Sequence, residues 1–226
     1  MSQIAKRIWS SVGKKFLMAL TGLAMIGFLV EHLIGNFLLL SKNPVPYNEY
    51  GHFLISFGNL LIVAEFILIG ILVAHMISAI SISIGKKTAR PEDYKVKKDA
   101  GRTSKKTFSS MTMIYTGVIL FVFLVIHIKT FKFGPYYNTA VDGVEMRDLH
   151  KLVWETFQNP VYAVWYVFAL VFLGFHLRHG FWSAFQSLGV SHPRLSPLIS
   201  TVGVLTAAFL AVGFIGIPIW IYIMGA

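Results

Sequence analysis

The stretches Thr21–His32 (TGLAMIGFLVEH) and Thr116–His127 (TGVILFVFLVIH) repeat each other, and they decide the fold. Each begins with Thr-Gly, reaches Phe-Leu-Val at the same spacing and ends with a histidine, inside an apolar run of membrane-spanning length. Two further histidines, His75 and His176, lie in two other apolar runs. Because an imidazole is costly in hydrocarbon, intramembrane histidines indicate a functional site by default. The sequence therefore predicts a membrane protein whose helices share a histidine site.

The composition is that of an integral membrane protein. Of the 226 residues 55% are hydrophobic and 13% charged, and the mean hydropathy is +0.66. At 1.5 Å per residue, an apolar run of this length crosses a hydrocarbon core of about 30 Å as a helix, the secondary structure that pairs every backbone group within one segment. The sequence predicts an all-α integral membrane protein, residues 1–226 forming one transmembrane domain with four of its five helices in a bundle. The five runs lie at about residues 16–40, 58–84, 108–131, 161–186 and 197–224.

Positive charge predicts the orientation. Of the 20 Lys and Arg residues, most lie in the N-terminal segment, in residues 85–107 and in the last connection, which five alternating spans place on one side. By the positive-inside rule the N-terminus is cytoplasmic and the C-terminus outside. The net charge of +10 is thus a topology signal and a protein-docking surface, and we expect no nucleic-acid partner. The opposite side holds only Lys42, Lys129, Lys132, Arg147 and Lys151.

The four intramembrane histidines sort into two depths. His32 and His127 follow the cytoplasmic starts of their spans by about 24 and 28 Å of helix, which places both toward the outer leaflet. His75 and His176 follow the outer starts of the returning spans by about 22–26 Å, which places both toward the cytoplasmic leaflet. Charge alone set the orientation, yet the histidines form one pair at each depth.

Two imidazoles from facing helices are the ligands of a b-type haem, one on each face of the porphyrin. Two such pairs predict two haem b groups, one above the other, as an electron path across the bilayer. The second ring nitrogen of each ligand is expected to donate to a backbone carbonyl. Small residues near the ligands would let the macrocycle approach, and the candidates are Gly22, Gly35, Gly117 and Gly174.

The fourth span offers two ligand candidates, His176 and His179, three residues apart. We favour His176 because its surroundings are more apolar and its depth matches that of His75. His179 and the neighbouring Arg178 lie nearer the cytoplasmic surface, where they are candidate contacts for a haem propionate. The chain has no cysteine, which excludes iron–sulfur ligation and covalent haem attachment.

Two carboxyl groups also lie within the apolar runs. Glu31 and Glu65 are candidates for a quinone or proton role, because an intramembrane acid is paired, protonated or functional. Glu65 lies about 10 Å below the outer start of its span, which suits proton exchange with a quinol. Glu49 and His52 are alternative candidates for this quinone or proton role on the outer side. For both residues a position in an ordinary solvated loop is the simpler interpretation. His150 and His192 lie outside the runs, and no role is assigned to them.

Taken together, these stretches resemble the cytochrome b membrane anchor of succinate dehydrogenases and fumarate reductases, in its five-helix, single-subunit, di-haem form. The resemblance runs nearly end to end and depends on the order and depth of several short stretches rather than on one motif. It implies that His75 and His176 hold the proximal haem on the cytoplasmic side, and His32 and His127 the distal haem. The stretches are Glu31-His32-Leu33 through Asn36-Phe37, Ala74-His75, Ile126-His127, and Phe175-His176-Leu177 with Gly180-Phe181-Trp182-Ser183.

The resemblance also implies the partners and the setting. These are a flavoprotein subunit with FAD, an iron–sulfur subunit on the cytoplasmic face, menaquinone as the quinone substrate, and the cytoplasmic (inner) membrane of a bacterium. The chain would serve respiratory complex II and the tricarboxylic acid cycle without acting on the dicarboxylate itself. Three alternatives remain: the di-haem cytochrome b of another quinone-linked dehydrogenase, a haem-free proton-coupled transporter, and a plain structural anchor. The first four spans lack an interior proline, which disfavours the broken helices typical of transporters.

Overall fold

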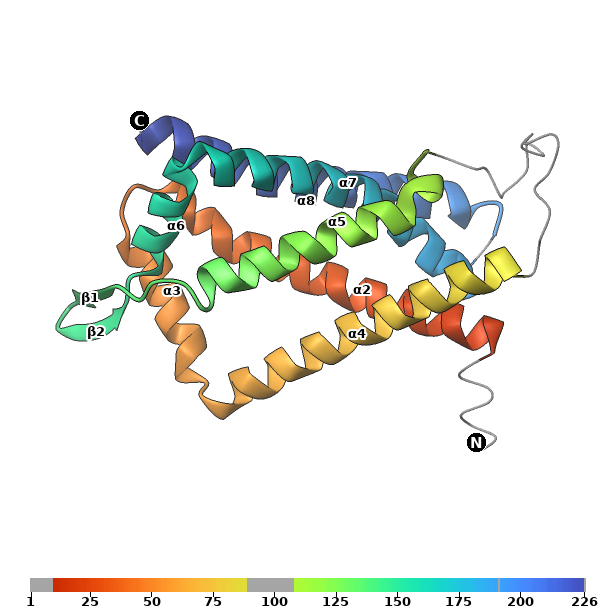
Figure 1. The fold of residues 1–226 in the computed structure, drawn as a ribbon, viewed down its shortest axis with the longest axis horizontal. Helices are drawn as coiled ribbons and strands as arrows, with labels where there is room; N and C mark the ends of the chain where they lie inside the picture. The colour runs from red at the N-terminus through yellow and green to blue at the C-terminus, as the bar shows by residue number, and fades with distance from the viewer. Residues whose placement is uncertain (1–9, 89–107, 191, 226) are drawn as a thin grey trace.

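Five long helices form the membrane-spanning part of the molecule (Figure 1). The computed structural model describes residues 10–88, 108–190 and 192–225. Within these ranges five helices are long and apolar enough to cross a membrane, which confirms the predicted all-α, multi-pass membrane fold. They are α2 (Ser11–Asn36), α4 (Asn59–Thr88), α5 (Phe108–Phe131), α7 (Pro160–Ser187) and α8 (Leu195–Gly225).

The helix boundaries follow capping residues as well as hydropathy. α2 begins at Ser11, before the apolar run, because the side chain of Ser10 accepts a hydrogen bond from the backbone N–H of Gly13 at 3.1 Å. The helix therefore includes a polar first turn. An apolar pattern alone predicts a later first residue for this helix. α7 begins at Pro160, directly after Asn159, whose side chain accepts from the backbone N–H of Val161 at 2.9 Å.

Shorter elements gather at one end of the bundle, called here the hairpin end, opposite the amino end where α2 begins (Figure 1). The turn of the hairpin is Asp142-Gly143, both at positive φ (49° and 79°), a signal for tight two-residue hairpins that the sequence analysis did not use. The predicted outer connections thus contain regular structure. The elements are η1 (Phe37–Leu40), α3 (Val45–Ser56), β1 (Asn138–Val141) paired antiparallel with β2 (Val144–Arg147), and α6 (Leu149–Gln158).

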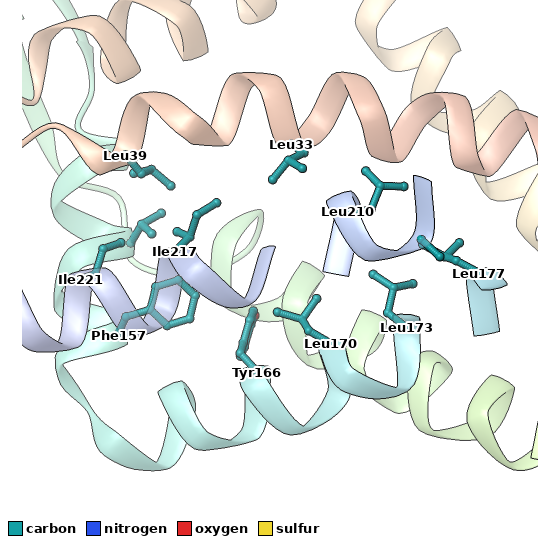
Figure 2. Close-up of a cluster of buried hydrophobic side chains, with 12 residues drawn as sticks. Leu33, Leu39, Phe157, Tyr166, Leu170, Leu173, Leu177, Leu210, Ile217 and Ile221 are labelled. Atoms are coloured by element: carbon teal, nitrogen blue, oxygen red, sulfur yellow. The ribbon is translucent and has the colours of Figure 1, made fainter. Parts of the chain in front are cut away.

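The buried core lies between α2, α7 and α8 (Figure 2). Leu33, Leu210 and Ile221 are fully buried there, and Tyr166 is 3% exposed. α4 packs mainly against α2, and no residue of its most apolar window is buried in the protein. α5 packs mainly against α7. The four helices α2, α4, α5 and α7 thus form two antiparallel units, α2 with α4 and α5 with α7.

The ends of the helices alternate as five spans require. α2 starts, α4 ends, α5 starts and α7 ends at the amino end, whereas the C-terminus lies at the hairpin end (Figure 1). The cations of the N-terminal segment before Ser10 and those of 89–107 lie outside the described residues. The cytoplasmic orientation of the amino end therefore stays a prediction from charge.

Candidate functional site

The first histidine pair joins α2 to α5 toward the hairpin end. The ring centroids of His32 and His127 lie 5.8 Å apart, with the ring planes 82° from one another. Aromatic rings surround both imidazoles and give the pair an apolar setting. Phe28 and Phe214 lie against His32, and Phe123, Phe131 and Tyr166 lie against His127.

The second pair joins α4 to α7 toward the amino end. The ring centroids of His75 and His176 lie 6.4 Å apart, with a plane angle of 57°. The structure thus brings together the histidines that share a predicted depth, His32 with His127 and His75 with His176. None of the four is fully buried by protein atoms.

The two pairs are stacked along the bundle, and the repeat sets their separation. Thr21 of α2 contacts His75, whereas His32, on the same helix, belongs to the other pair. Thr116 of α5 contacts His176 in the same way, and α5 also carries His127. Threonine and histidine are the ends of each repeated stretch, so both helices separate the pairs by about 16 Å.

Threonine hydroxyls lie against the second ring nitrogen of both histidines in the amino-end pair. The Oγ1 atom of Thr21 lies 3.2 Å from Nδ1 of His75, and that of Thr116 lies 3.0 Å from Nδ1 of His176. Both threonines are buried, at 7% and 2% exposure. The expected carbonyl partner is present at His75, where the backbone of Met18 also bonds the ring, and a threonine hydroxyl from the neighbouring helix lies against Nδ1 of both rings. Sequence reasoning missed the hydroxyls, although the Thr-Gly repeat was their signal.

Tyr166 is the corresponding neighbour in the hairpin-end pair. Its hydroxyl lies 3.4 Å from Nδ1 of His127, a longer contact than those of the two threonines. The residue sits in the buried core of α7, and its ring also contacts Phe157. The two pairs thus differ in the hydrogen-bond partners of their imidazoles.

The four candidate glycines divide into two groups. A Cβ atom at Gly22 would lie 3.4 Å from the ring of His75, and one at Gly117 would lie 3.8 Å from the ring of His176. Gly35 instead packs under the ring of Tyr50, and a Cβ at Gly174 would lie 3.0 Å from Ala211 of α8. Gly35 and Gly174 therefore make room for the neighbouring Tyr50 and Ala211, and their expected approach to a macrocycle stays a prediction.

The spacing of each pair suits one metal atom between two imidazoles. A metal about 2 Å from an imidazole nitrogen lies about 3 Å from the ring centroid, so two rings on opposite sides have centroids about 6 Å apart. The observed 5.8 and 6.4 Å agree with this value. Across the part of the chain that the structure describes, no three His, Cys, Asp or Glu side chains gather as a metal site. Each pair therefore offers two ligands, which suits a metal whose remaining ligands come from a macrocycle.

His179 and Arg178, the other site candidates in α7, follow His176 of the amino-end pair. His176, rather than His179, faces His75 across the bundle. Arg178, one residue nearer the amino end than Leu177, is exposed, and His179, two residues nearer, is half-buried. Their proposed contacts with a propionate remain predictions.

Both intramembrane acids have polar partners. The hydroxyl of Tyr50 donates to Oε1 of Glu31 at 2.7 Å, and burial, followed by this hydrogen bond and the carboxylate charge, raises the pKa of Tyr50 to about 12. Glu65 of α4 forms an ion pair with Lys132, one residue past the end of α5, and both side chains are exposed. Glu65 is thus placed at the hairpin end, where the sequence analysis predicts the outer side.

Glu49 and His52, the alternative candidates for a quinone or proton role, border an open pocket of about 450 Å³ between α3 and the β-hairpin. Glu49 and His52 contribute its polar lining together with Asp142. The pocket is separate from both histidine pairs, because its other lining residues belong to α3 and to β1, β2 and their turn.

His150, to which no role was assigned, belongs to a buried network that fixes the hairpin end. Its backbone N–H donates to Oδ1 of Asn48 at 2.9 Å, and its Nε2 lies 3.1 Å from the carbonyl of Ser41. Asn48, 1% exposed, also donates to Oδ1 of Asp148 at 2.9 Å, and Asp148 caps α6 by accepting from the backbone N–H of Lys151. The network ties α3 to α6 and so fixes the connections at the hairpin end of the helices.

No protein-family model, curated protein or solved structure matches this chain.

Proposed function

We propose that this chain is the membrane-anchor cytochrome b of a succinate:quinone oxidoreductase, carrying electrons between an iron–sulfur subunit and menaquinone. The observation that carries the proposal is the stacking of two histidine pairs, at metal-spanning distance, in a bundle of membrane helices. Two pairs separated by about 16 Å suit a chain of redox centres better than a single binding site.

In this function the histidines act as axial ligands. His75 and His176 would hold the proximal haem b near the amino end, and His32 and His127 the distal haem b near the hairpin end. When bound, each haem b supplies a one-electron redox centre. The protein sets the potential of each through the imidazoles, their hydrogen bonds and the surrounding apolar side chains.

The acids of the hairpin end would serve the quinone. Glu65 lies there with part of its side chain exposed beside Lys132, so a bound quinol would reach its carboxylate and could pass a proton to it. Glu31 is occupied by the hydroxyl of Tyr50, which makes it the weaker candidate. The pairing of Glu65 with a cation also offers a polar anchor near the membrane surface.

The partners follow from the resemblance and the charge pattern. The amino end, predicted to be cytoplasmic, would dock the iron–sulfur subunit, which in turn joins the FAD-containing flavoprotein that interconverts succinate and fumarate. The setting is the cytoplasmic membrane of a bacterium. The dicarboxylate chemistry would belong to the flavoprotein and not to this chain.

The same histidine geometry would serve the di-haem cytochrome b of another quinone-linked dehydrogenase, which differs in its electron donor. A haem-free proton-coupled transporter is less well supported. Among the described residues, the interior proline of a spanning helix is Pro218 of α8, outside the four helices that carry the histidines. The unbroken helices α2, α4, α5 and α7 lack the interruptions typical of transporter sites.

The test is a dithionite-reduced minus air-oxidised spectrum of the purified full chain, with pyridine haemochrome quantification per polypeptide. Two b-type haems per chain are expected. One haem would mean that one histidine pair has another role. A folded protein without haem, produced with ample haem supply, would sink the cytochrome proposal and favour the transporter. Copurification with succinate:quinone reductase activity separates complex II from other dehydrogenases.

A further inference from the structure

The hydroxyl hydrogens of Thr21 and Thr116 have acceptors within their own helices. Oγ1 of Thr21 donates to the backbone carbonyl of Leu17 at 2.8 Å, with that of Met18 at 3.2 Å. Oγ1 of Thr116 donates to the carbonyl of Met113 at 3.0 Å. Such bonds back to the preceding turn are the ordinary arrangement for threonine inside a helix. A hydroxyl has one hydrogen, so only its oxygen lone pairs remain for a further partner.

That further partner is the Nδ1 atom of a histidine, at 3.2 Å for His75 and 3.0 Å for His176. While the hydroxyl hydrogen stays on its own helix, the oxygen accepts from Nδ1, so this arrangement favours the tautomer with the proton on Nδ1 in both rings. A neutral imidazole protonated at Nδ1 has a bare Nε2 atom. This is the tautomer that can ligate a metal through Nε2.

The second observation is that the arrangement occurs twice. In each unit of two antiparallel helices, the Thr-Gly of the first helix contacts the histidine of the second, Thr21-Gly22 with His75 and Thr116-Gly117 with His176. The glycine leaves space beside the same ring that the threonine bonds. The adjoining glycine therefore lets the neighbouring ring approach closely, and the threonine fixes its orientation.

The hairpin-end pair lacks this arrangement. His127 has the hydroxyl of Tyr166 at 3.4 Å, and the described contacts of His32 are with aromatic rings. A strong acceptor on Nδ1 makes an imidazole a more basic ligand, which stabilises the oxidised state of a bound iron. A threonine hydroxyl on each of the two ligands is thus a feature of the His75/His176 pair and would affect the potential of that haem alone.

We propose that Thr21 and Thr116 are positioning residues that hold His75 and His176 in the ligating tautomer and lower the reduction potential of the haem bound between them. This inference rests on the proposed cytochrome function. It assigns the Thr-Gly repeat a role of its own, distinct from the histidines that end each repeated stretch.

The test compares Thr21→Val and Thr116→Val, which keep the shape and remove the acceptor, with Thr21→Ser and Thr116→Ser, which keep the hydroxyl. Thr201→Val is the matched control, because Thr201 makes the same bond to its own helix, with Pro197 at 3.1 Å, on the exposed side of α8. The readouts are potentiometric titration of the two haem components and their ferric electron paramagnetic resonance signals, in the purified full chain.

Each valine variant is expected to raise the midpoint potential of the His75/His176 component and shift its resonance, leaving the other component unchanged. The double valine variant should shift it further, and serine should restore the wild-type values. Should a valine variant not accumulate, alanine against serine at the same position gives the same comparison. Unchanged potentials in the valine variants, equal shifts with serine, or shifts in both components would overturn the inference. If the wild type holds two haems and the valine variants leave both potentials unchanged, the cytochrome proposal stands and the inference about the threonines fails. A wild type without haem would overturn both the proposal and the inference.

Discussion

The ring of His32 on α2 lies edge to face against the ring of His127 on α5, with centroids 5.8 Å apart and planes at 82°. The same two helices carry the threonines that bond the other histidine pair, Thr21 and Thr116. α2 and α5 therefore contribute to both pairs, as does α7 through His176 and Tyr166, whereas α4 contributes the ring of His75 alone. Changes in α2 or α5 can be assigned to one pair or the other by their depth along the helix.

Replacing a histidine should remove a spectral component that it shares with its partner. His32→Ala and His127→Ala are expected to delete the same b-haem component, and His75→Ala and His176→Ala the other, because each haem needs both axial ligands. Low-temperature reduced-minus-oxidised spectra resolve the components. His192→Ala, at an exposed position, should retain both. Loss of the same component in His32→Ala and His75→Ala would show that the pairing is wrong.

His179→Ala should leave two haems in place. Since His176 faces His75, the neighbouring His179 is expected to alter the midpoint potential of the proximal component without deleting it. Redox titration of the variant measures this shift. Complete loss of that haem in His179→Ala, with retention in His176→Ala, would reverse the choice of ligand.

Glu65→Gln should slow haem reduction by a menaquinol analogue at least tenfold, because an amide cannot accept the proton of the quinol. Lys132→Gln should have a smaller effect, since it removes the partner and leaves the carboxylate. Both variants should fold, because an exposed ion pair contributes about 0–1 kcal/mol.

Stopped-flow reduction measures the rates for these variants. Glu155→Gln is the matched control, because Glu155 also faces a lysine, Lys151, at 3.9 Å at the hairpin end. A wild-type rate in Glu65→Gln would show that the ion pair only braces α4 against the end of α5.

Asn48→Ala should destabilise the protein by about 1–3 kcal/mol, because it leaves the buried N–H of His150 without its acceptor and removes a donor to Asp148. Asn43→Ala, which removes an exposed bond to the backbone N–H of Val45, should cost less. Thermal unfolding in detergent, followed by circular dichroism, compares the two. Equal losses would contradict a structural role for the buried network.

Tyr50 should ionise late in an alkaline titration. Burial is the largest cause of its raised pKa of about 12, and the bond to Glu31 adds to it, so Glu31→Gln should lower the pKa only in part. The phenol ionises near 10 in the unfolded chain, so its contribution to stability is complete below pH 10 and is lost as the pH rises to about 12. Difference titration at 295 nm against Tyr50→Phe measures the midpoint. A midpoint near 10 in the folded protein would contradict this.

The spans and the depth of each histidine could be predicted from the sequence, because helical rise converts residue number into depth once five runs alternate. His32 and His127 therefore fall together without knowledge of which helices are neighbours. The contact between Thr21 and His75 could not be predicted, because it depends on the rotation of α2 and α4 about their axes. The repeat marked Thr21 as unusual but did not identify its partner.

The hairpin end was the least predictable part. Its strands are four residues long, and the sequence analysis did not use the turn signal of Asp142-Gly143. Asn48 lies about a hundred residues before Asp148 and His150 in the sequence, and only tertiary contacts reveal their network. Gly35 and Gly174 likewise looked equivalent to Gly22 in sequence, although their neighbours are Tyr50 and Ala211.

Each histidine pair takes one ring from the α2–α4 unit and one from the α5–α7 unit. A ribosome delivers the α2–α4 unit first, carrying half of the ligands for each proposed haem and both ligands for neither. Biogenesis of the cytochrome would therefore have an obligatory order. The α2–α4 unit would insert first and the α5–α7 unit would insert beside it. Binding of the cofactors between the two units would come last. Haem supply would limit maturation only after most of the chain has entered the membrane.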